Sequence, residues 1–210
     1  MADAELEGLA TFLYEMGQLK RSKRTGWWLP GVKDPESVAE HSFRTAIIGH
    51  LLAVMEGADP ARTALLCLFH DTQETRVGDI PSVGRDYLTT APNEQITDDQ
   101  VAAFPAEVGE AVRELVGEYE ARTSLEAQVA RDADKLECLI QAREYEVQGY
   151  ANVTPWVETS AVALRTVSAK RLAEACQQVG PGEWWRPFVE AYGRAPRSSA
   201  GNGPTPDAEV

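Results

Sequence analysis

Apolar residues recur with a helical period along most of this chain, and that period restricts the folds open to it. In the first segment, one helix face carries Leu6, Leu9, Leu13 and Met16. Residues with this spacing lie on one side of an α-helix. No segment shows the period-two alternation that is typical of a half-buried strand. The sequence therefore predicts an all-α protein.

Further helices are predicted by the same spacing and by the residues that flank each segment. We expect them over residues 35–56, 61–70, 106–122, 125–148, 158–179 and 183–192. The segment 35–56 is apolar on most sides, which predicts a central, buried helix. Residues 88–105 are polar and poorly periodic, so we expect a loop there. Residues 1–193 are expected to form a single domain, whereas Gly, Pro, Ser and Ala dominate residues 194–210 and predict a disordered tail.

Charge and composition exclude several classes of function. The 210 residues include 20 Lys and Arg against 33 Asp and Glu, so the formal net charge is −13. Nucleic acids and anionic membranes attract broad positive potential, so we expect neither as a partner. A small anionic substrate would need a local basic pocket or a metal ion. No apolar run approaches the roughly 20 residues of a membrane span. The three cysteines lack C-x-x-C spacing and are interpreted as reduced thiols, which predicts a cytoplasmic location.

A histidine and an aspartate stand together at the end of an apolar segment. His70 and Asp71 directly follow the apolar run at residues 65–69. A buried ionised carboxylate needs a partner, and either a metal cation or a hydrogen bond from the histidine would supply one. Of the other two histidines, His50 lies nine residues after His41, about two and a half helical turns away. We interpret His50 as structural.

A third carboxylate lies inside a predicted helix. Asp134 is close to the apolar stripe of the segment 125–148. Taken alone, it is more simply interpreted as a solvated carboxylate than as a ligand. The neighbouring Asp132 and Glu137 are interpreted as surface carboxylates.

The order and spacing of His41, His70-Asp71 and Asp134 resemble those of the HD-domain metal-dependent phosphohydrolases. More narrowly, the chain resembles the small 5′-deoxynucleotidases of that superfamily, both the bacterial enzyme and its eukaryotic HD-domain homologues. The matching stretches lie at residues 19–27, 36–42, 70–81, 118–120, 132–137 and 143–146. A bare His-Asp dipeptide is weak support, but this ordered set spans most of positions 5–150 and is specific.

The resemblance implies an HD-domain helical bundle that holds one divalent metal ion. By the family pattern, the ligands are His41, His70, Asp71 and Asp134. Two imidazoles and two carboxylates suit Co²⁺, Mn²⁺, Zn²⁺ or Fe²⁺ and differ from the tetrahedral thiolate site of a structural zinc. The family's H-D-x-x-E pattern implies that Glu74 orients or deprotonates the attacking water, with Asp71 as a second catalytic residue that helps to handle the proton.

Three further residues are candidates for substrate binding. The resemblance implies that Asp79 meets the sugar, although Gly-Asp before Pro is often only a turn. Arg24 offers a planar fork for phosphate oxygens, and Trp27 offers a stacking face or wall for a nucleoside. The basic cluster 20–24 could equally be favourable charge at a helix end, and Trp28 competes with Trp27. The Arg-Trp pair is adjacent in the bacterial enzyme, whereas two residues separate it here, as in the eukaryotic-like branch.

Four residues outside these assignments are also interpreted. Glu118, in a family-like Glu-Tyr-Glu run, is a further candidate to approach the site. Trp156, Trp184 and Trp185 lie outside the matching stretches and are interpreted as packing residues near the C-terminal helices.

Together these features predict a metal-dependent phosphomonoesterase that converts deoxyribonucleoside 5′-monophosphates to deoxynucleosides and phosphate. Two alternatives stay open: an HD phosphohydrolase acting on a guanosine alarmone or cyclic nucleotide, and a non-catalytic nucleotide-binding HD protein. Against the first, Glu74-Thr75 stands where alarmone hydrolases usually carry Glu-Asp. Against the second, a scaffold needs no intact ligand set. We expect a small-molecule nucleotide as substrate, and a homodimer, as is common among the resembled proteins.

Overall fold

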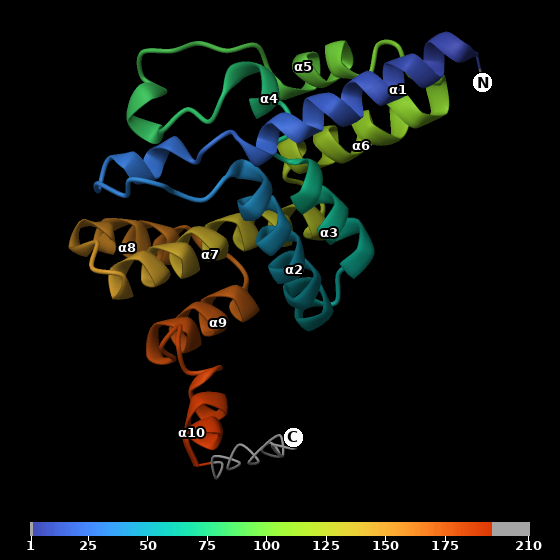
Figure 1. The fold of residues 1–210 in the computed structure, drawn as a ribbon. Coiled ribbons are helices and arrows are strands. Elements are labelled where there is room, and N and C mark those ends of the chain that lie inside the picture. The colour runs from blue at the N-terminus through green and yellow to red at the C-terminus, as the bar shows by residue number, and fades with distance from the viewer. Residues whose placement is uncertain (1, 195–210) are drawn as a thin grey trace, which may run out of the picture. The chain divides into compact units, whose positions relative to one another are not determined.

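The computed structural model describes residues 2–194, and their regular structure is almost entirely helical (Figure 1). Within these residues there is no β-strand, only an isolated bridge between Lys23 and Ser37. The predicted all-α class is confirmed. The chain divides into two compact units, one ending at Gln178 and the other beginning at Val179.

The first unit holds most of the helices. They are α1 (Asp3–Met16), α2 (Val38–Glu56), α3 (Pro60–Phe69), α4 (Glu74–Val77), α5 (Asn93–Gln100), α6 (Ala106–Ala121), α7 (Leu125–Val147), α8 (Thr154–Ala163) and α9 (Val167–Gln178). Short 3₁₀ turns also occur, namely η1 (Gly17–Lys20), η2 (Thr25–Trp28), η3 (Ser82–Gly84) and η4 (Ala151–Val153). The second unit contains α10 (Arg186–Arg194). The predicted tail falls almost wholly outside the described residues, and the boundary at residue 193 stays a prediction.

The core of the first unit forms where α2, α3 and α7 pack together, and Figure 1 shows α2 crossing α7. Four leucines there are 0% exposed, namely Leu52, Leu66, Leu136 and Leu139. Burial of each contributes about 1.5–3 kcal/mol. The helix α2 is central, as expected, since it packs on α3 and α7, but the expectation that it is buried is only partly met. Its outer face exposes large apolar side chains, namely Phe43, Ile47, Leu51, Val54 and Met55.

Side-chain caps fix where the central helices begin. Ser37 Oγ accepts a hydrogen bond from Glu40 N, and the Glu40 carboxylate accepts one from Ser37 N. This capping box starts α2 and places His41 in its first turn. Asp59 caps α3, and Ser124 caps α7.

The segment 88–105 was expected to be a loop, but it contains the helix α5. The buried Thr97 and Gln100 of α5 are held by polar contacts rather than by an apolar stripe. Gln73 Nε2 donates to Thr97 Oγ1 at 2.8 Å, and Gln100 Nε2 donates to the Thr72 carbonyl at 3.0 Å. Because these polar contacts produce no apolar periodicity in the sequence, the sequence did not predict this helix.

The helix expected over 158–179 is instead two helices. The Asp132 carboxylate accepts hydrogen bonds from the backbone N–H groups of Arg165 and Thr166, and it thereby holds the break between α8 and α9. Among the described residues, no helix combines the length and hydropathy that a bilayer crossing requires.

Candidate metal and substrate site

The fold brings the four expected ligands together. His41 comes from α2, His70 and Asp71 from the end of α3, and Asp134 from α7. His70 Nε2 lies 3.1 Å from Asp71 Oδ2, and His41 Nε2 lies 3.3 Å from Asp134 Oδ1. A longer separation of 3.9 Å joins His41 Nε2 to Asp71 Oδ2. All four side chains are at most 18% exposed, so they form a nearly buried cluster.

The chemistry of the two imidazoles fits a cation. His41 Nδ1 lies 2.6 Å from Glu137 Oε2, and His70 Nδ1 lies 2.7 Å from the Cys67 carbonyl oxygen. A carbonyl only accepts, so His70 Nδ1 must carry a proton. Both Nε2 atoms are buried and have no hydrogen-bond partner. Buried nitrogens without a partner are costly, and a metal ion at their meeting point would satisfy both. The atoms of His41, His70 and Asp71 that could bind it lie within 4.8 Å of one another.

Glu137 was expected at the surface, and that interpretation is wrong. Its side chain is 0% exposed and carries the hydrogen bond to His41. Arg44 holds the other oxygen, with Nη2 at 2.8 Å from Glu137 Oε1, and it also contacts Gln141 and Glu144. Burial opposes ionisation, but His41 and Arg44 lower the pKa of Glu137 below its usual value.

A polar stripe on α7 could have revealed Glu137. Asp134, Glu137, Gln141 and Glu144 follow helical spacing, and three of the seven residues between them, Leu136, Leu139 and Ala142, are buried and apolar. The surface interpretation of Asp132 is likewise wrong. That residue is 2% exposed because it caps the break before α9.

Glu74 begins α4, close to the ligands. Its Oε2 is buried without a hydrogen-bond partner. Burial and the charges of Asp71 and Asp79 raise the pKa of Glu74 to about 9. Without a cation nearby the carboxyl is therefore protonated at neutral pH, and a metal ion on the adjacent ligands would lower its pKa toward the range that acid–base catalysis requires.

Arg24 connects the ligand cluster with Asp79. Its Nη1 lies 3.1 Å from Asp71 Oδ2 and 3.5 Å from Asp79 Oδ1. Nη2 donates to Cys138 Sγ at 3.5 Å. Burial raises the pKa of the Cys138 thiol to about 11, so the group beside Arg24 stays protonated at neutral pH. The Arg24 side chain is 16% exposed, and its contacts with Asp71 and Asp79 hold the guanidinium beside the ligands.

Asp79 binds the turn that carries Arg24. Its Oδ2 accepts hydrogen bonds from Thr25 N at 2.5 Å and Thr25 Oγ1 at 2.8 Å. Its Oδ1 faces Arg24, and the side chain is 10% exposed. The structure thus gives Asp79 a role in positioning Arg24.

Trp27 is a buried wall rather than a free stacking face. It is 3% exposed, and its Nε1 donates to Glu36 Oε1 at 3.0 Å. Its ring packs between Tyr145 and Trp156, with centroid distances of 5.2 and 5.8 Å. Trp28 is 53% exposed and does not line the cavity beside Trp27.

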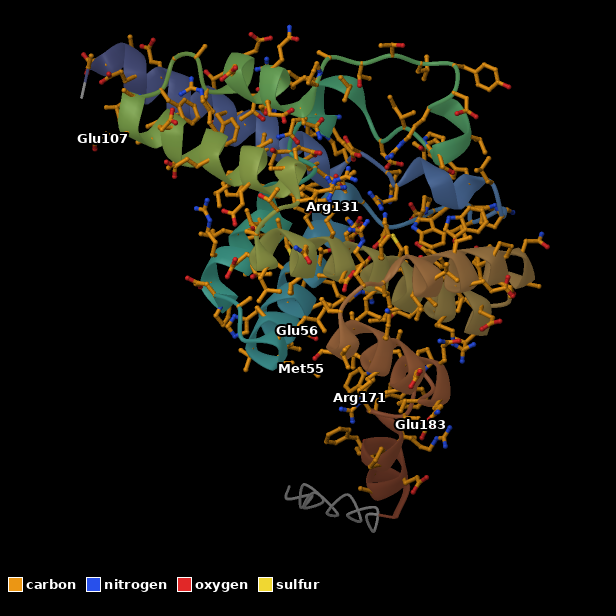
Figure 2. All side chains as sticks on the ribbon, turned by 180° about the vertical axis from the view of Figure 1, so that it is seen from behind. Met55, Glu56, Glu107, Arg131, Arg171 and Glu183 are labelled. Atoms are coloured by element: carbon orange, nitrogen blue, oxygen red, sulfur yellow. The ribbon has the colours of Figure 1, made fainter. Side chains whose placement is uncertain are left out.

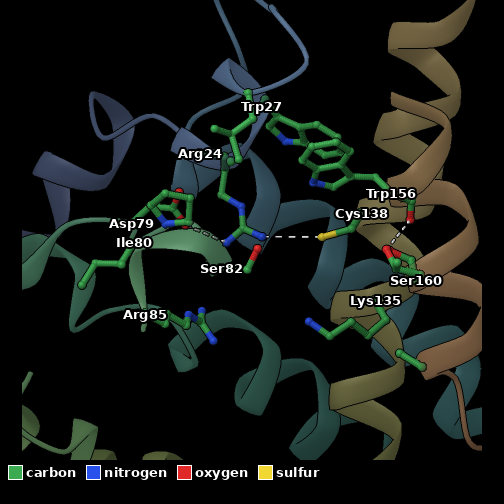
Figure 3. Close-up of a pocket in the computed structure, with 15 residues that line it drawn as sticks. Arg24, Trp27, Asp79, Ile80, Ser82, Arg85, Lys135, Cys138, Trp156 and Ser160 are labelled. Atoms are coloured by element: carbon green, nitrogen blue, oxygen red, sulfur yellow. Dashed lines mark hydrogen bonds and ion pairs between the residues drawn. The ribbon is translucent and has the colours of Figure 1, made fainter. Parts of the chain in front are cut away.

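Two adjoining cavities share Ile80 and Arg85. One, of about 380 Å³, reaches His70, Asp71 and Glu74. The other, of about 400 Å³, is lined by Arg24, Trp27 and Asp79, as Figure 3 shows. The packing interpretation of Trp156 is incomplete, because its ring also lines the second cavity. The sequence gives no signal for this role of Trp156, because α8 lies outside the stretches that resemble the HD-domain family.

Basic side chains gather around these cavities although the whole chain is acidic. The cavity walls include Arg85, Arg122, Arg131 and Lys135. Arg131, labelled in Figure 2, projects from α7 and pairs with Glu120 on α6 at 2.9 Å. Such side chains supply the local basic pocket that an anionic substrate needs.

Two other candidates lie elsewhere. Glu118 pairs with Arg62 at 2.7 Å and accepts a hydrogen bond from Ser124 at 2.6 Å. It lines neither cavity, so the structure does not bring it to the site. His50 is exposed on α2, so it is not a core residue.

Residues 16–179 match the HD domain family. The chain is 35% identical over 149 residues to the 5′-deoxynucleotidase HDDC2 of Bos taurus, an alignment that covers 70% of this chain and 72% of that protein. It is 30% identical over 152 residues to the 5′-deoxynucleotidase hdd1 of Schizosaccharomyces pombe, covering 70% and 76%. A solved structure of a conserved hypothetical protein from Pyrococcus furiosus is similar with a TM-score of 0.68 and 30% identity, over 81% of this chain and 99% of that chain.

Proposed function

Since this chain belongs to the HD-domain family, we propose that it is a metal-dependent phosphomonoesterase acting on deoxyribonucleoside 5′-monophosphates. The products are a deoxynucleoside and phosphate. The observation that carries this proposal is the pair of buried Nε2 atoms of His41 and His70, which have no hydrogen-bond partner and face the carboxylates of Asp71 and Asp134. The substrate class follows from the relatives that bear the name 5′-deoxynucleotidase.

His41, His70, Asp71 and Asp134 would hold the metal ion, and Co²⁺, Mn²⁺, Zn²⁺ and Fe²⁺ all suit this donor set. When bound, such an ion neutralises phosphate charge and lowers the pKa of water. Glu137 and the Cys67 carbonyl fix the two imidazoles so that their Nε2 atoms face the cluster.

The remaining residues handle the phosphate and the protons. The guanidinium of Arg24 binds phosphate oxygens, and Asp79 keeps that guanidinium in place. The charge of a divalent ion on the adjacent ligands would lower the pKa of Glu74 and ionise it, and the carboxylate would then take a proton from the attacking water as the water oxygen bonds to phosphorus. The bond from phosphorus to the 5′-oxygen breaks, and the proton held by Glu74 passes to that oxygen, which leaves as the 5′-hydroxyl of the deoxynucleoside. Asp71 orients Arg24 through the 3.1 Å contact.

We further infer that the protein forms a homodimer through the outer face of α2. Five large apolar side chains there are 46–65% exposed, namely Phe43, Ile47, Leu51, Val54 and Met55. A contiguous apolar face of this kind marks an interaction surface, and a second copy covers it symmetrically. Light scattering should report a dimer for the wild type and a monomer for Leu51→Glu. Val162→Glu, at a position 87% exposed on α8, should stay dimeric. A monomeric wild type contradicts this inference.

The activity is tested on metal-free protein that is reloaded with one metal at a time. Phosphate release is then measured from the four deoxyribonucleoside 5′-monophosphates and from AMP. We expect metal-dependent release and a preference for dAMP over AMP. His70→Ala should contain no stoichiometric metal by elemental analysis, because one of the expected ligands is gone. Absence of release with every metal would overturn the proposal, whereas equal efficiency on dAMP and AMP would overturn only the sugar preference.

A further inference from the structure

We propose that Trp156 on α8 is the stacking surface for the nucleobase of the substrate, an inference that rests on the proposed function. Trp156 lines the cavity that also holds Arg24 and Asp79. It comes from a segment that carries none of the expected site residues, and it is partly exposed.

The two cavities differ in the chemistry of their walls. The cavity beside His70 and Asp71 is lined largely by charged and polar side chains, and no Phe, Tyr or Trp is among its lining residues. The cavity beside Arg24 contains two indole rings, Trp27 and Trp156. A nucleotide has an anionic end and a flat aromatic end. Its phosphate therefore suits the first cavity and its base the second.

Arg24 connects the two ends. Its side chain lines the aromatic cavity, while its Nη1 lies 3.1 Å from Asp71 in the other cavity. Figure 3 shows Arg24 in the centre of the view, with Asp79 on one side and Trp156 and Ser160 on the other. A nucleotide whose phosphate meets Arg24 can thus extend its base toward α8.

Of the two indoles, only Trp156 has ring surface to offer. Trp27 is 3% exposed, and its ring is packed against Tyr145 and Trp156. The rings of Trp27 and Trp156 are inclined at 34°, with their centroids 5.8 Å apart. Trp27 therefore backs Trp156 and holds its ring, so that little side-chain freedom is lost when a base binds.

Stacking of this kind gives affinity with little selection among bases, because every base has a π face. The lining of the same cavity also includes the apolar Leu29, Pro81 and Ala163. We therefore expect the four deoxynucleotides to differ in catalytic efficiency by less than about tenfold.

The test compares dAMP with deoxyribose 5-phosphate, which has the same phosphate and sugar but no base. Trp156→Ala should lower kcat/KM for dAMP by about 5- to 150-fold, the range for loss of one stacked base. Its efficiency on deoxyribose 5-phosphate should be unchanged. Trp156→Phe should restore most of the efficiency on dAMP. Trp184→Ala removes an indole that is 76% exposed and lines neither cavity, so it should match the wild type on both substrates.

A binding measurement separates this inference from the proposed function. Calorimetric titration with deoxyadenosine, which has no phosphate to hydrolyse, should show binding to the wild type and weaker binding to Trp156→Ala. If the wild type hydrolyses dAMP and Trp156→Ala loses the same factor in kcat/KM on dAMP and on deoxyribose 5-phosphate, then Trp156 has only a structural role and the inference is overturned. Unchanged efficiency and unchanged deoxyadenosine binding in Trp156→Ala would also overturn the inference, although the proposed function would stand. Trp156-dependent binding without any hydrolysis would support the subsite and refute the activity.

Discussion

His41 Nδ1 and Glu137 Oε2 lie 2.6 Å apart, and neither side chain has any exposed surface. This contact joins α2 to α7 across 96 positions of the sequence. It places the proton of a neutral His41 on Nδ1 and leaves the Nε2 lone pair facing Asp71 and Asp134. Carboxylates in this position orient metal-binding imidazoles and raise their basicity.

Glu137→Gln should weaken metal binding by about 10- to 100-fold. The amide can donate to His41 Nδ1 and so move the ring proton to Nε2, which then cannot bind the ion. The dissociation constant is measured by competition with a chelator. Glu144→Gln is the matched control, because Glu144 shares Arg44 but does not contact His41. An unchanged affinity in Glu137→Gln would assign that carboxylate to packing alone.

Glu74→Gln should retain stoichiometric metal and lose turnover. Acid–base assistance contributes about 10²- to 10⁴-fold, so kcat should fall by that factor while elemental analysis gives the wild-type metal content. Glu107→Gln serves as the control, at an exposed position in the first turn of α6 that is labelled in Figure 2. A near wild-type kcat at saturating metal would remove Glu74 from the chemistry.

Glu15 should make the stability of the protein depend on pH. Its hydrogen bonds with Arg76, Gln100 and Thr75 outweigh burial and lower the pKa of Glu15 to about 2. Because the folded pKa lies below the ordinary value of 4.5, the stabilisation is present above about pH 4.5 and fades as the pH falls toward 2.

Denaturant titrations of Glu15→Gln at several pH values test this dependence. At pH 7 the free energy of unfolding of the variant should be about 1–2 kcal/mol lower than that of the wild type. This difference between the two proteins should shrink below pH 4.5. Glu7→Gln alters an exposed carboxylate on the same helix and should show no such trend. A difference that stays constant with pH would contradict the assignment.

Two glycines in helices should respond in opposite ways to alanine. A Cβ on Gly49 would lie 2.6 Å from Cys67 Sγ and 3.3 Å from Thr63 Cγ2, so the α2–α3 contact must open. Gly49→Ala should therefore cost about 1–3 kcal/mol. Nothing lies within 4 Å of a Cβ on Gly117 in α6, and Gly117→Ala should add about 0.5–1 kcal/mol. Thermal unfolding of both variants measures these changes in stability. An unchanged stability in Gly49→Ala would show that the contact between α2 and α3 has room for the added methyl group.

The sequence by itself determined the helical class, and a family resemblance in it named the expected ligands. Apolar periodicity reports which face of a helix is buried, and Ser124 marks a helix start through a contact with its own next turn. The ordered His41, His70-Asp71 and Asp134 resemble the pattern of a known family, and that resemblance, rather than their spacing taken alone, singled them out.

Only the tertiary structure decided what lies opposite each buried face. Glu137 and Asp132 are charged residues that a pattern assigns to the surface, yet both are buried because His41 and the backbone before α9 supply their partners. Trp156 reaches the cavity because α8 packs on α7, next to Trp27. A helical period carries no information about contacts between distant segments, and the free energy of burying a polar or aromatic group depends on those contacts.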